Sequence, residues 1–335
     1  YGGNFFPGST DMNRVAFEIP IPFLDKALPI HWYGLMIAVG FVLGYGIMLW
    51  RAKQIKFPAE RVADIVFTAV LAGIVGARLL YVINYWNRDF AGKPFTTIFA
   101  IHRGGLVFYG GFIGGAVALI ILARVKKLNL AVITDLCALG VPLAHTFGRI
   151  GCFLNGCCYG CVTTSAIGFR YPIKGVTEDG RILPYADILH HQIANGQLTA
   201  ETVEYLEHTG EIPAGALTQM DTEGFYRFLQ LVEPHYCLPV VPIQLFNSLR
   251  NILTFIVLLL ICRRVKVPGQ LAAIFLILYG VGRFITEFWR GDYPELYLKL
   301  TSAQWICIVV IPFGAWLYYW LGRRRQEPPT AEDKS

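Results

Sequence analysis

His145-Thr-Phe-Gly-Arg-Ile-Gly-Cys-Phe-Leu-Asn-Gly-Cys-Cys-Tyr-Gly160 follows an apolar segment at 130–147 and leads into a polar one at 161–241. This position predicts that the stretch lies where a membrane helix meets the aqueous face. Polar groups at membrane depth are costly and mark functional sites by default, and glycines let a backbone or a ligand approach closely. A simpler interpretation is a glycine-rich helix end with one arginine reaching the interface. We favour a site, because a second arginine segment of the same kind follows at 279–287.

The composition indicates a membrane protein. Of the 335 residues, 55% are hydrophobic and only 16% are charged, whereas soluble domains carry about 25% charged residues. Several apolar runs reach about twenty residues, the length that crosses a bilayer as a helix. The net charge of +6 lies in short loops and forms no patch for nucleic acid. We therefore predict a polytopic membrane protein that binds no nucleic acid.

The apolar runs divide the chain. The predicted fold class is an all-α polytopic membrane protein with seven transmembrane helices and an extracytoplasmic insert between spans four and five. The spans are expected at about 30–50, 62–85, 105–123, 130–147, 243–262, 270–288 and 303–321. The corresponding parts are a lead-in at 1–29, spans one to four with the quoted motif at 30–160, the insert at 161–241, spans five to seven at 242–322 and a tail at 323–335. Within the lead-in we expect an interfacial strand or a short amphipathic piece at about 16–28.

Basic residues set the expected orientation. They cluster in alternate loops, at 51–61, 124–127, 263–266 and 323–325, and the positive-inside rule places such loops in the cytoplasm. The prediction is a multi-pass membrane protein with its N-terminus outside and its C-terminus in the cytoplasm. Arg88, Lys93 and Arg103, in one loop expected outside, are a weaker signal against it.

On this topology the polar residues of the spans share one depth, in the outer half of the bilayer. They are Arg78, Tyr109, Arg283 and Glu287 toward the outer ends of their spans, with Arg149 and Asn155 just past the outer end of span four. Several arginines at one depth predict a site for an anionic head group, because guanidinium groups bind phosphate oxygens in a bidentate manner. Arg283 and Glu287 are four residues apart and can pair on one helix face. Glu287 could simply neutralise Arg283 inside a bundle, and the two interpretations can coexist.

Short motifs run through the chain from about 30 to 322. They are His31-Trp-Tyr33-Gly34-Leu, Gly76-Ala-Arg78-Leu with Tyr81 following, Gly104-Gly105-Leu-Val-Phe-Tyr109-Gly-Gly111, Gly148-Arg149-Ile-Gly-Cys-Phe-Leu-Asn155-Gly, Pro242-Ile-Gln244-Leu-Phe, Tyr279-Gly-Val-Gly-Arg283-Phe-Ile-Thr-Glu287-Phe and Ser302-Ala-Gln304-Trp. In this combination the chain resembles the prolipoprotein diacylglyceryl transferase family of bacterial inner membranes, and the resemblance implies the same location for this protein. The segment 161–241 resembles the family only in its position.

The resemblance implies an activity. Members of this family transfer the diacylglyceryl group of phosphatidylglycerol to the lipobox cysteine thiol of a prolipoprotein and release glycerol-1-phosphate. No metal or diffusible cofactor is expected. The resemblance makes Arg149 and Arg283 the phosphate contacts and Tyr33, Asn155, Tyr109 and Tyr279 polar groups of the site. Arg78 and Glu287 are further substrate-binding candidates, and Gly148 and Gly160 would allow close approach.

Three positions depart from the family pattern. Tyr109 stands where the family often has histidine, Cys152 where it commonly has asparagine, and Cys157 where it has glutamate. A tyrosine with its ordinary pKa near 10 is a poor base at neutral pH. We expect Tyr109 to position the substrate or donate a hydrogen bond. His145 or His102 is an alternative acceptor for the thiol proton.

The cysteines near the motif leave two readings open. Cys152, Cys157, Cys158 and Cys161 could bind zinc, or some could form a disulfide on an oxidising outer face. We expect a disulfide in preference to a metal, and free packed thiols are a third state. Cys137, Cys262 and Cys307 lie in or at the ends of apolar runs and are expected to be packing residues.

Two other functions fit part of the pattern. An anion transporter or channel would use the same arginines but needs a polar path to the cytoplasm. The inner halves of the spans, such as 252–260 and 312–317, are nearly wholly apolar, which argues against that path. A non-catalytic homologue that binds lipid or lipoprotein is compatible with the departures at 109, 152 and 157.

Overall fold

The computed structural model describes residues 14–20, 27–100, 105–161, 240–290 and 300–324, together with 163, 165, 167–169, 171 and Leu298. The chain divides into two compact units, and the boundary passes through five of its helices. Unit 1 consists of residues 1–40, 143–254 and 278–312. Unit 2 consists of residues 41–142, 255–277 and 313–335. Most of the predicted insert and His102 lie outside the described residues.

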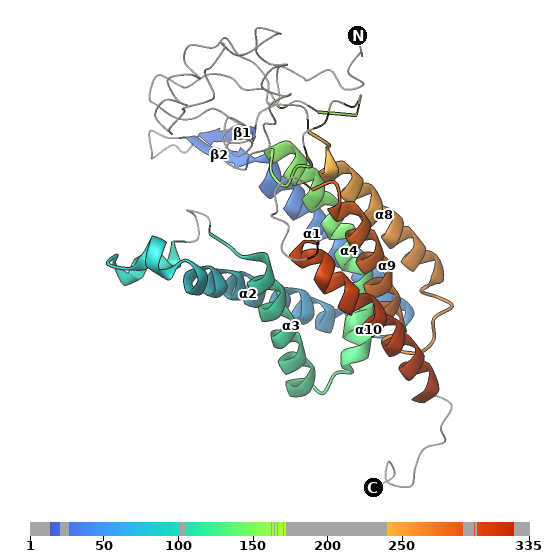
Figure 1. The fold of residues 1–335 in the computed structure, drawn as a ribbon. Coiled ribbons are helices and arrows are strands. Elements are labelled where there is room, and N and C mark those ends of the chain that lie inside the picture. The colour runs from blue at the N-terminus through green and yellow to red at the C-terminus, as the bar shows by residue number, and fades with distance from the viewer. Residues whose placement is uncertain are drawn as a thin grey trace, which may run out of the picture. The chain divides into compact units, whose positions relative to one another are not determined.

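The named elements of the described part of the chain are helices apart from one β-hairpin (Figure 1). Its long helices are α1 (Trp32–Gln54), α2 (Ala59–Asn84), α3 (Phe108–Val125), α4 (Leu130–Asn155), α8 (Ile243–Ile261), α9 (Gln270–Glu287) and α10 (Ser302–Arg324). Among the described residues, six of these helices are long and apolar enough to cross a membrane, whereas the apolar part of α3, Tyr109–Val125, is shorter. These helices agree with a polytopic membrane protein, and the count of seven spans stays a prediction.

The lead-in contains a β-hairpin before the first helix. Strand β1 (Val15–Pro20) pairs antiparallel with β2 (Ala27–His31), and β2 leads directly into α1 (Figure 1). Its side chains Phe17, Ile19 and Leu28 are about half exposed. An apolar exposed ribbon next to a membrane helix fits an interfacial position. The strand expected near 16–28 is therefore present, as part of a hairpin.

Helix α4 corrects the predicted end of span four. It continues to Asn155, eight residues beyond 147, so Arg149 and Asn155 lie within the helix and not after it. The helix ends at Gly156, whose φ is 69°. The amide of Gly156 donates to the Phe153 carbonyl and that of Cys157 to the Cys152 carbonyl, both at 3.1 Å. This pair of bonds is a Schellman motif, which terminates a helix at a left-handed glycine.

In unit 2, α2 and α3 pack through glycines. A Cβ atom at Gly76 would lie 2.4 Å from the Gly110 carbonyl oxygen, and one at Gly110 would lie 2.3 Å from the Gly76 oxygen. Small residues let membrane helices approach this closely. The glycine-dense run after residue 104 therefore serves helix packing in α3.

The basic clusters all belong to unit 2, and contacts join the helix ends that carry them. The Arg51 guanidinium donates to the Cys262 carbonyl at 2.7 Å, between the ends of α1 and α8. The Asp135 carboxylate accepts from the amides of Gly269 (2.7 Å) and Ala272 (2.8 Å) at the start of α9. A carboxylate there satisfies amides that have no partner within the helix. These contacts support one common face for the clusters, and its cytoplasmic side stays a prediction.

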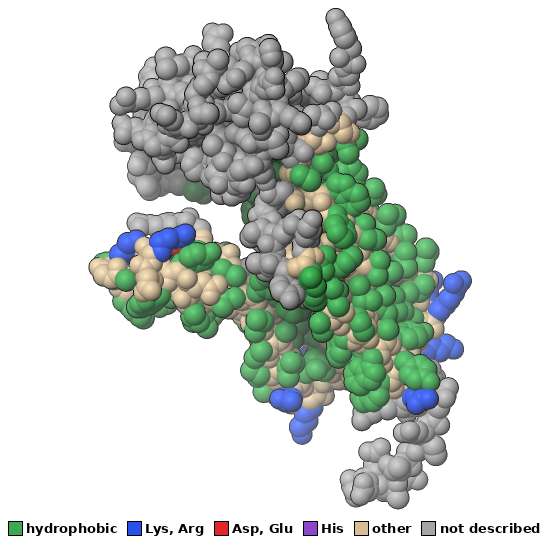
Figure 2. Space-filling view, viewed as in Figure 1, with side chains coloured by type: hydrophobic (Ala, Val, Ile, Leu, Met, Phe, Trp, Pro, Cys, Tyr) green, Lys and Arg blue, Asp and Glu red, His purple; other side chains and the backbone are tan. Residues whose placement is uncertain are grey.

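The flanks of the helices are hydrophobic. In the space-filling view, hydrophobic side chains cover them and Lys and Arg side chains gather at helix ends (Figure 2). Val42, Leu260 and Val309 are each 69% exposed. Such a surface is unfavourable in water and suits lipid.

Candidate active site

One face of α4 carries ionisable groups at helical spacing in unit 1. His145, Arg149 and Cys152 are related as i, i+4 and i+7, so they lie in line. The Arg149 Nε donates to His145 Nε2 at 3.3 Å. Because an accepting nitrogen carries no proton, this bond assigns the imidazole proton to Nδ1. The His145 ring also stacks on Tyr279 of α9, with 6.1 Å between centroids.

Arg283 and Glu287 of α9 form the predicted i, i+4 pair. Arg283 Nη2 lies 2.8 Å from Glu287 Oε2, and their side chains are 12% and 1% exposed. The other carboxylate oxygen accepts from the Thr301 hydroxyl at 3.1 Å. A carboxylate this deeply buried stays charged only with such partners. Glu287 therefore holds Arg283 in place and neutralises part of the local charge.

Thr301 is itself fixed by the start of α10. The backbone amide of Thr301 donates to Gln304 Oε1 at 2.9 Å, and the backbone amide of Gln304 donates to the Thr301 hydroxyl oxygen at 3.3 Å. This reciprocal pair is a capping box. Gln304 of the motif Ser302-Ala-Gln304 therefore holds Thr301, which bonds to Glu287, the partner of Arg283.

Arg250, which the sequence analysis did not select, adds a third arginine from α8. Its Nη1 donates to the Thr286 hydroxyl at 3.1 Å and its Nη2 to Asn251 Oδ1 at 3.0 Å. Its guanidinium carbon lies 5.1 Å from the centre of the Tyr279 ring. Among the described residues, no carboxylate pairs with Arg250.

The positive charges of Arg149, Arg250 and Arg283 lie near enough to act on one another. Among the described residues, the only buried carboxylate that neutralises part of this charge is that of Glu287, which pairs with Arg283. It also supplies no acceptor for two buried donors, Nε of Arg250 and Nη1 of Arg283. An excess of partly buried positive charge with unused, buried donor atoms is the arrangement that binds an anion.

A signal for Arg250 was present in the sequence. Polar residues recur on α8 at helical spacing and are buried, namely Gln244, Asn247, Ser248, Asn251 and Thr254. The sequence analysis treated 243–262 as an apolar span, because the apolar residues dominate its average. A period of 3.6 residues among the polar positions would have identified an inward polar face.

The two glycines of the predicted site, Gly148 and Gly160, differ in the space around them. A Cβ atom at Gly160 would lie 2.6 Å from the carbonyl oxygens of both Trp289 and Val241, so the close approach there is between backbone segments. At Gly148 the described residues leave open space, with nothing within 4 Å of a Cβ atom. Gly148 therefore leaves room beside Arg149 for a ligand.

Tyr33 and Asn155 lie near the end of α4. Tyr33 packs over Gly151, with its Cδ2 3.2 Å from the position of a Cβ atom there, and its side chain is 40% exposed. The Asn155 carbonyl accepts from Arg14 Nε at 2.8 Å. Unit 1 thus brings Tyr33 to the helix that carries Arg149 and Asn155.

Three thiols meet at the same helix end. The sulfur atoms of Cys152, Cys157 and Cys158 all lie within 4.8 Å of one another, and the three cysteines are free. Cys158 has a φ of 58°, a left-handed conformation that costs a non-glycine residue about 1 kcal/mol. Hydrogen bonds from the Cys152 and Cys157 thiols lower the pKa of Cys158, and the charges of Arg149 and Arg290 act in the same direction.

The chain was compared with known proteins. The family model for prolipoprotein diacylglyceryl transferase matches residues 20–320. The chain belongs to this family. A phosphatidylglycerol–prolipoprotein diacylglyceryl transferase of Streptococcus uberis is 31% identical over 92% of this chain and 96% of its own length. Those of Coxiella burnetii (29%, 92% and 97%) and Clostridium perfringens (29%, 87% and 91%) are similar to it as well.

Arg78, a family motif residue in unit 2, is surrounded by backbone carbonyls. Its Nε donates to Ile98 (2.7 Å), its Nη1 to Gly105 (3.0 Å) and its Nη2 to Thr97 (2.9 Å). These bonds hold the loop after α2 against the helix. They support a structural role, and its binding of substrate stays a prediction. Tyr109, also in unit 2, lies in the first turn of α3 and is 43% exposed.

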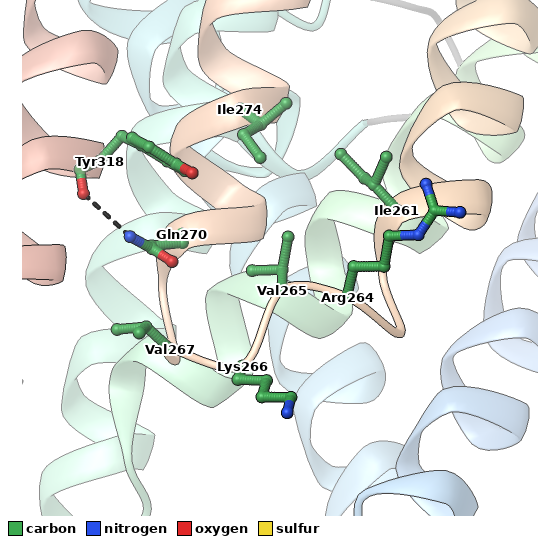
Figure 3. A pocket seen from close by; sticks show the side chains of 8 residues that line it. All are labelled: Ile261, Arg264, Val265, Lys266, Val267, Gln270, Ile274 and Tyr318. Atoms are coloured by element: carbon green, nitrogen blue, oxygen red, sulfur yellow. Dashed lines mark hydrogen bonds between the residues drawn. The ribbon is translucent and has the colours of Figure 1, made fainter.

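A pocket of unit 2 has none of the predicted site residues in its lining. The loop between α8 and α9 lines it with Arg264, Val265 and Lys266, and Gln270 beside them donates to the Tyr318 carbonyl at 3.1 Å (Figure 3). This loop is one of those expected in the cytoplasm. The unused donors of Arg250 and Arg283 make the arginine cluster the stronger candidate for a transferase site.

Proposed function

We propose that this protein transfers the diacylglyceryl group of phosphatidylglycerol to the lipobox cysteine thiol of a prolipoprotein, with Arg149, Arg250 and Arg283 binding the phosphate. Family membership supports the reaction. The observation that carries the site is the excess of partly buried positive charge, with the buried donors Nε of Arg250 and Nη1 of Arg283 unused among the described residues.

The charge change of the reaction fits this cluster. The acceptor sulfur attacks the glyceryl carbon that bears the phosphate, a C–S bond forms and the C–O bond breaks. The electron pair leaves on the phosphate oxygen, so a phosphodiester with one negative charge becomes a monoester with two. Arginines placed beforehand around the phosphate stabilise this added charge in the transition state more than in the ground state. They also hold the carbon in line for attack.

His145 positions Arg149 in this proposal and does not take the thiol proton. Its Nε2 lone pair already accepts from Arg149 Nε at 3.3 Å. Taking a proton there would break that bond and set two positive groups against each other. Glu287 positions Arg283 in the same way, through the 2.8 Å ion pair.

The membrane setting is part of the proposal. Seven spans, with α3 as the short third, place the N-terminal hairpin and the 161–241 insert outside and the basic helix ends in the cytoplasm. The arginines then face the outer leaflet, where both the lipid donor and the lipobox segment can enter from the bilayer. The exposed apolar flanks of the helices and the grouping of all basic clusters in unit 2 support this orientation.

The decisive experiment measures transfer of labelled diacylglyceryl from phosphatidylglycerol to a lipobox peptide by the purified protein. Arg149→Met, Arg250→Met and Arg283→Met should each lose transfer and phosphatidylglycerol binding. Arg88→Gln is the matched control, because Arg88 is an exposed arginine paired with Asp89 at 3.0 Å. A peptide with serine in place of the lipobox cysteine should receive no diacylglyceryl group.

Two outcomes would contradict the proposal. Lipid binding without transfer by the folded wild-type protein would indicate a non-catalytic homologue. Anion flux into vesicles that depends on the same arginines, without transfer, would indicate a transporter.

A further inference from the structure

The thiol cluster at the end of α4 is built by the fold of the chain. Cys152 lies one turn before the helix end, and the Schellman bond from the Cys157 amide to the Cys152 carbonyl, at 3.1 Å, turns the chain back on itself. The left-handed conformation of Cys158, with φ of 58°, then brings its sulfur to the other two. All three sulfur atoms lie within 4.8 Å of one another.

Three thiolates in this arrangement are ligands for a soft divalent cation. Zinc takes sulfur ligands at about 2.3 Å in a tetrahedron, and a site with three protein ligands keeps its fourth position open for a substrate. Cys161, the next thiol along the chain, is engaged elsewhere, since its sulfur donates to the Trp289 carbonyl at 3.3 Å. Within the described ranges, no further His, Cys, Asp or Glu side chain joins the three sulfur atoms.

The cluster adjoins the arginine site. Cys152 follows Arg149 by three residues on α4, so the two side chains share a helix face. The charge of Arg149 also acts on the Cys158 sulfur. An anionic cluster of metal and thiolates would offset part of the excess positive charge of the arginines.

We propose that Cys152, Cys157 and Cys158 bind Zn²⁺ and that its open position takes the thiol of the acceptor cysteine beside the bound phosphate. This inference rests on the proposed function. Coordination lowers the pKa of a thiol and releases its proton to water. The bound sulfur keeps an electron pair with which it forms the C–S bond, while the C–O bond breaks and its electron pair leaves with glycerol phosphate. No group is oxidised or reduced.

This role needs no separate protein base for the acceptor thiol. A histidine base is unnecessary where a metal ion generates the thiolate, and metal coordination is an established way of activating a nucleophile. The thioether product is a weaker ligand than the thiolate, so it can leave the metal.

The first test is the metal content of the full chain purified in detergent. Wild type and Cys161→Ser should carry about one zinc per chain, whereas Cys152→Ser, Cys157→Ser and Cys158→Ser should lose most of it. Replacing zinc with Co²⁺ should give a thiolate charge-transfer band in wild type and Cys161→Ser only. The absence of both zinc and this band in reduced wild-type protein would overturn the proposal, as would a disulfide among the three cysteines in active protein.

The second test concerns the acceptor. Adding a lipobox peptide with cysteine should change the Co²⁺ spectrum, and the serine peptide should leave it unchanged. A bound metal that does not respond to the cysteine peptide would overturn the activation role and leave a structural zinc site. Arg149→Met should keep the metal but lose phosphatidylglycerol binding, and Cys158→Ser should do the reverse. The metal measurements therefore decide this inference even if transfer itself fails.

Discussion

Arg283 Nη2 lies 2.8 Å from Glu287 Oε2, and the far oxygen of that carboxylate accepts from Thr301 at the start of α10. The pair therefore does more than neutralise a charge inside a bundle. It fixes one arginine of the candidate phosphate site to the first turn of another helix. Arg250 has no such carboxylate partner among the described residues, and this difference separates the expected effects of changing the two sites.

Glu287→Gln should destabilise the protein, because it leaves the buried Arg283 charge without its partner. Removing one member of a buried pair typically costs about 3–5 kcal/mol. The thermal midpoint in detergent should fall, and phosphatidylglycerol should raise it again by supplying an anion. A midpoint equal to that of wild type would show that the ion pair contributes little. Asp89→Asn, in an exposed pair with Arg88, is the control.

Arg250→Lys should weaken transfer, because an ammonium group cannot reproduce the bonds of the guanidinium to Thr286 and Asn251. We expect a loss of about 1–3 kcal/mol in binding of the phosphate, which is about fivefold to 150-fold. Titration with a short-chain phosphatidylglycerol measures it. Unchanged affinity in both Arg250→Lys and Arg250→Met would remove Arg250 from the site.

His145→Gln should keep most activity, because the glutamine Oε1 can accept from Arg149 in place of Nε2. His145→Phe should lose the acceptor and reduce transfer by about tenfold or more. The pH profile of the glutamine variant should match that of wild type, since His145 is assigned a positioning role. A profile that loses its acidic limb in His145→Gln would make His145 the base after all.

Gly148→Ala and Gly46→Ala form a matched pair of helix substitutions. Both positions have nothing within 4 Å of a Cβ atom among the described residues, so both should raise helix stability by about 0.5–1 kcal/mol. Only Gly148→Ala should weaken phosphatidylglycerol binding, because its methyl group enters the space beside Arg149. Equal affinity in the two variants would argue against a ligand at that position.

Gly160→Ala should destabilise unit 1 strongly, because its Cβ would lie 2.6 Å from two carbonyl oxygens. The amides of Gly160 and Cys161 bond to the Val241 and Trp289 carbonyls at 2.9 and 3.0 Å, and these bonds would be strained or lost. A lower thermal midpoint with little change in affinity per folded molecule is the expected result. Loss of lipid binding at an unchanged midpoint would instead indicate contact with the substrate.

The sequence alone determined the membrane class, the family and most helix positions, because long apolar runs and fixed motifs are local properties of the chain. It also predicted the Arg283–Glu287 pair, since residues four apart on a helix must share a face. The predicted end of span four fell eight residues before the end of α4, because the span was ended where the apolar segment stops, whereas the Schellman motif at Gly156 sets the end of the helix.

Only the tertiary structure decided which side chains from different helices meet. In the tertiary structure Arg250 contacts Tyr279 and Thr286, and Arg78 donates hydrogen bonds to loop carbonyls. Three thiols also lie together, for which the sequence alone allowed either a disulfide or a metal site. These relations depend on how faces of separate helices pack and how the chain folds back after a helix. Neither is encoded in the period or hydrophobicity of any single segment.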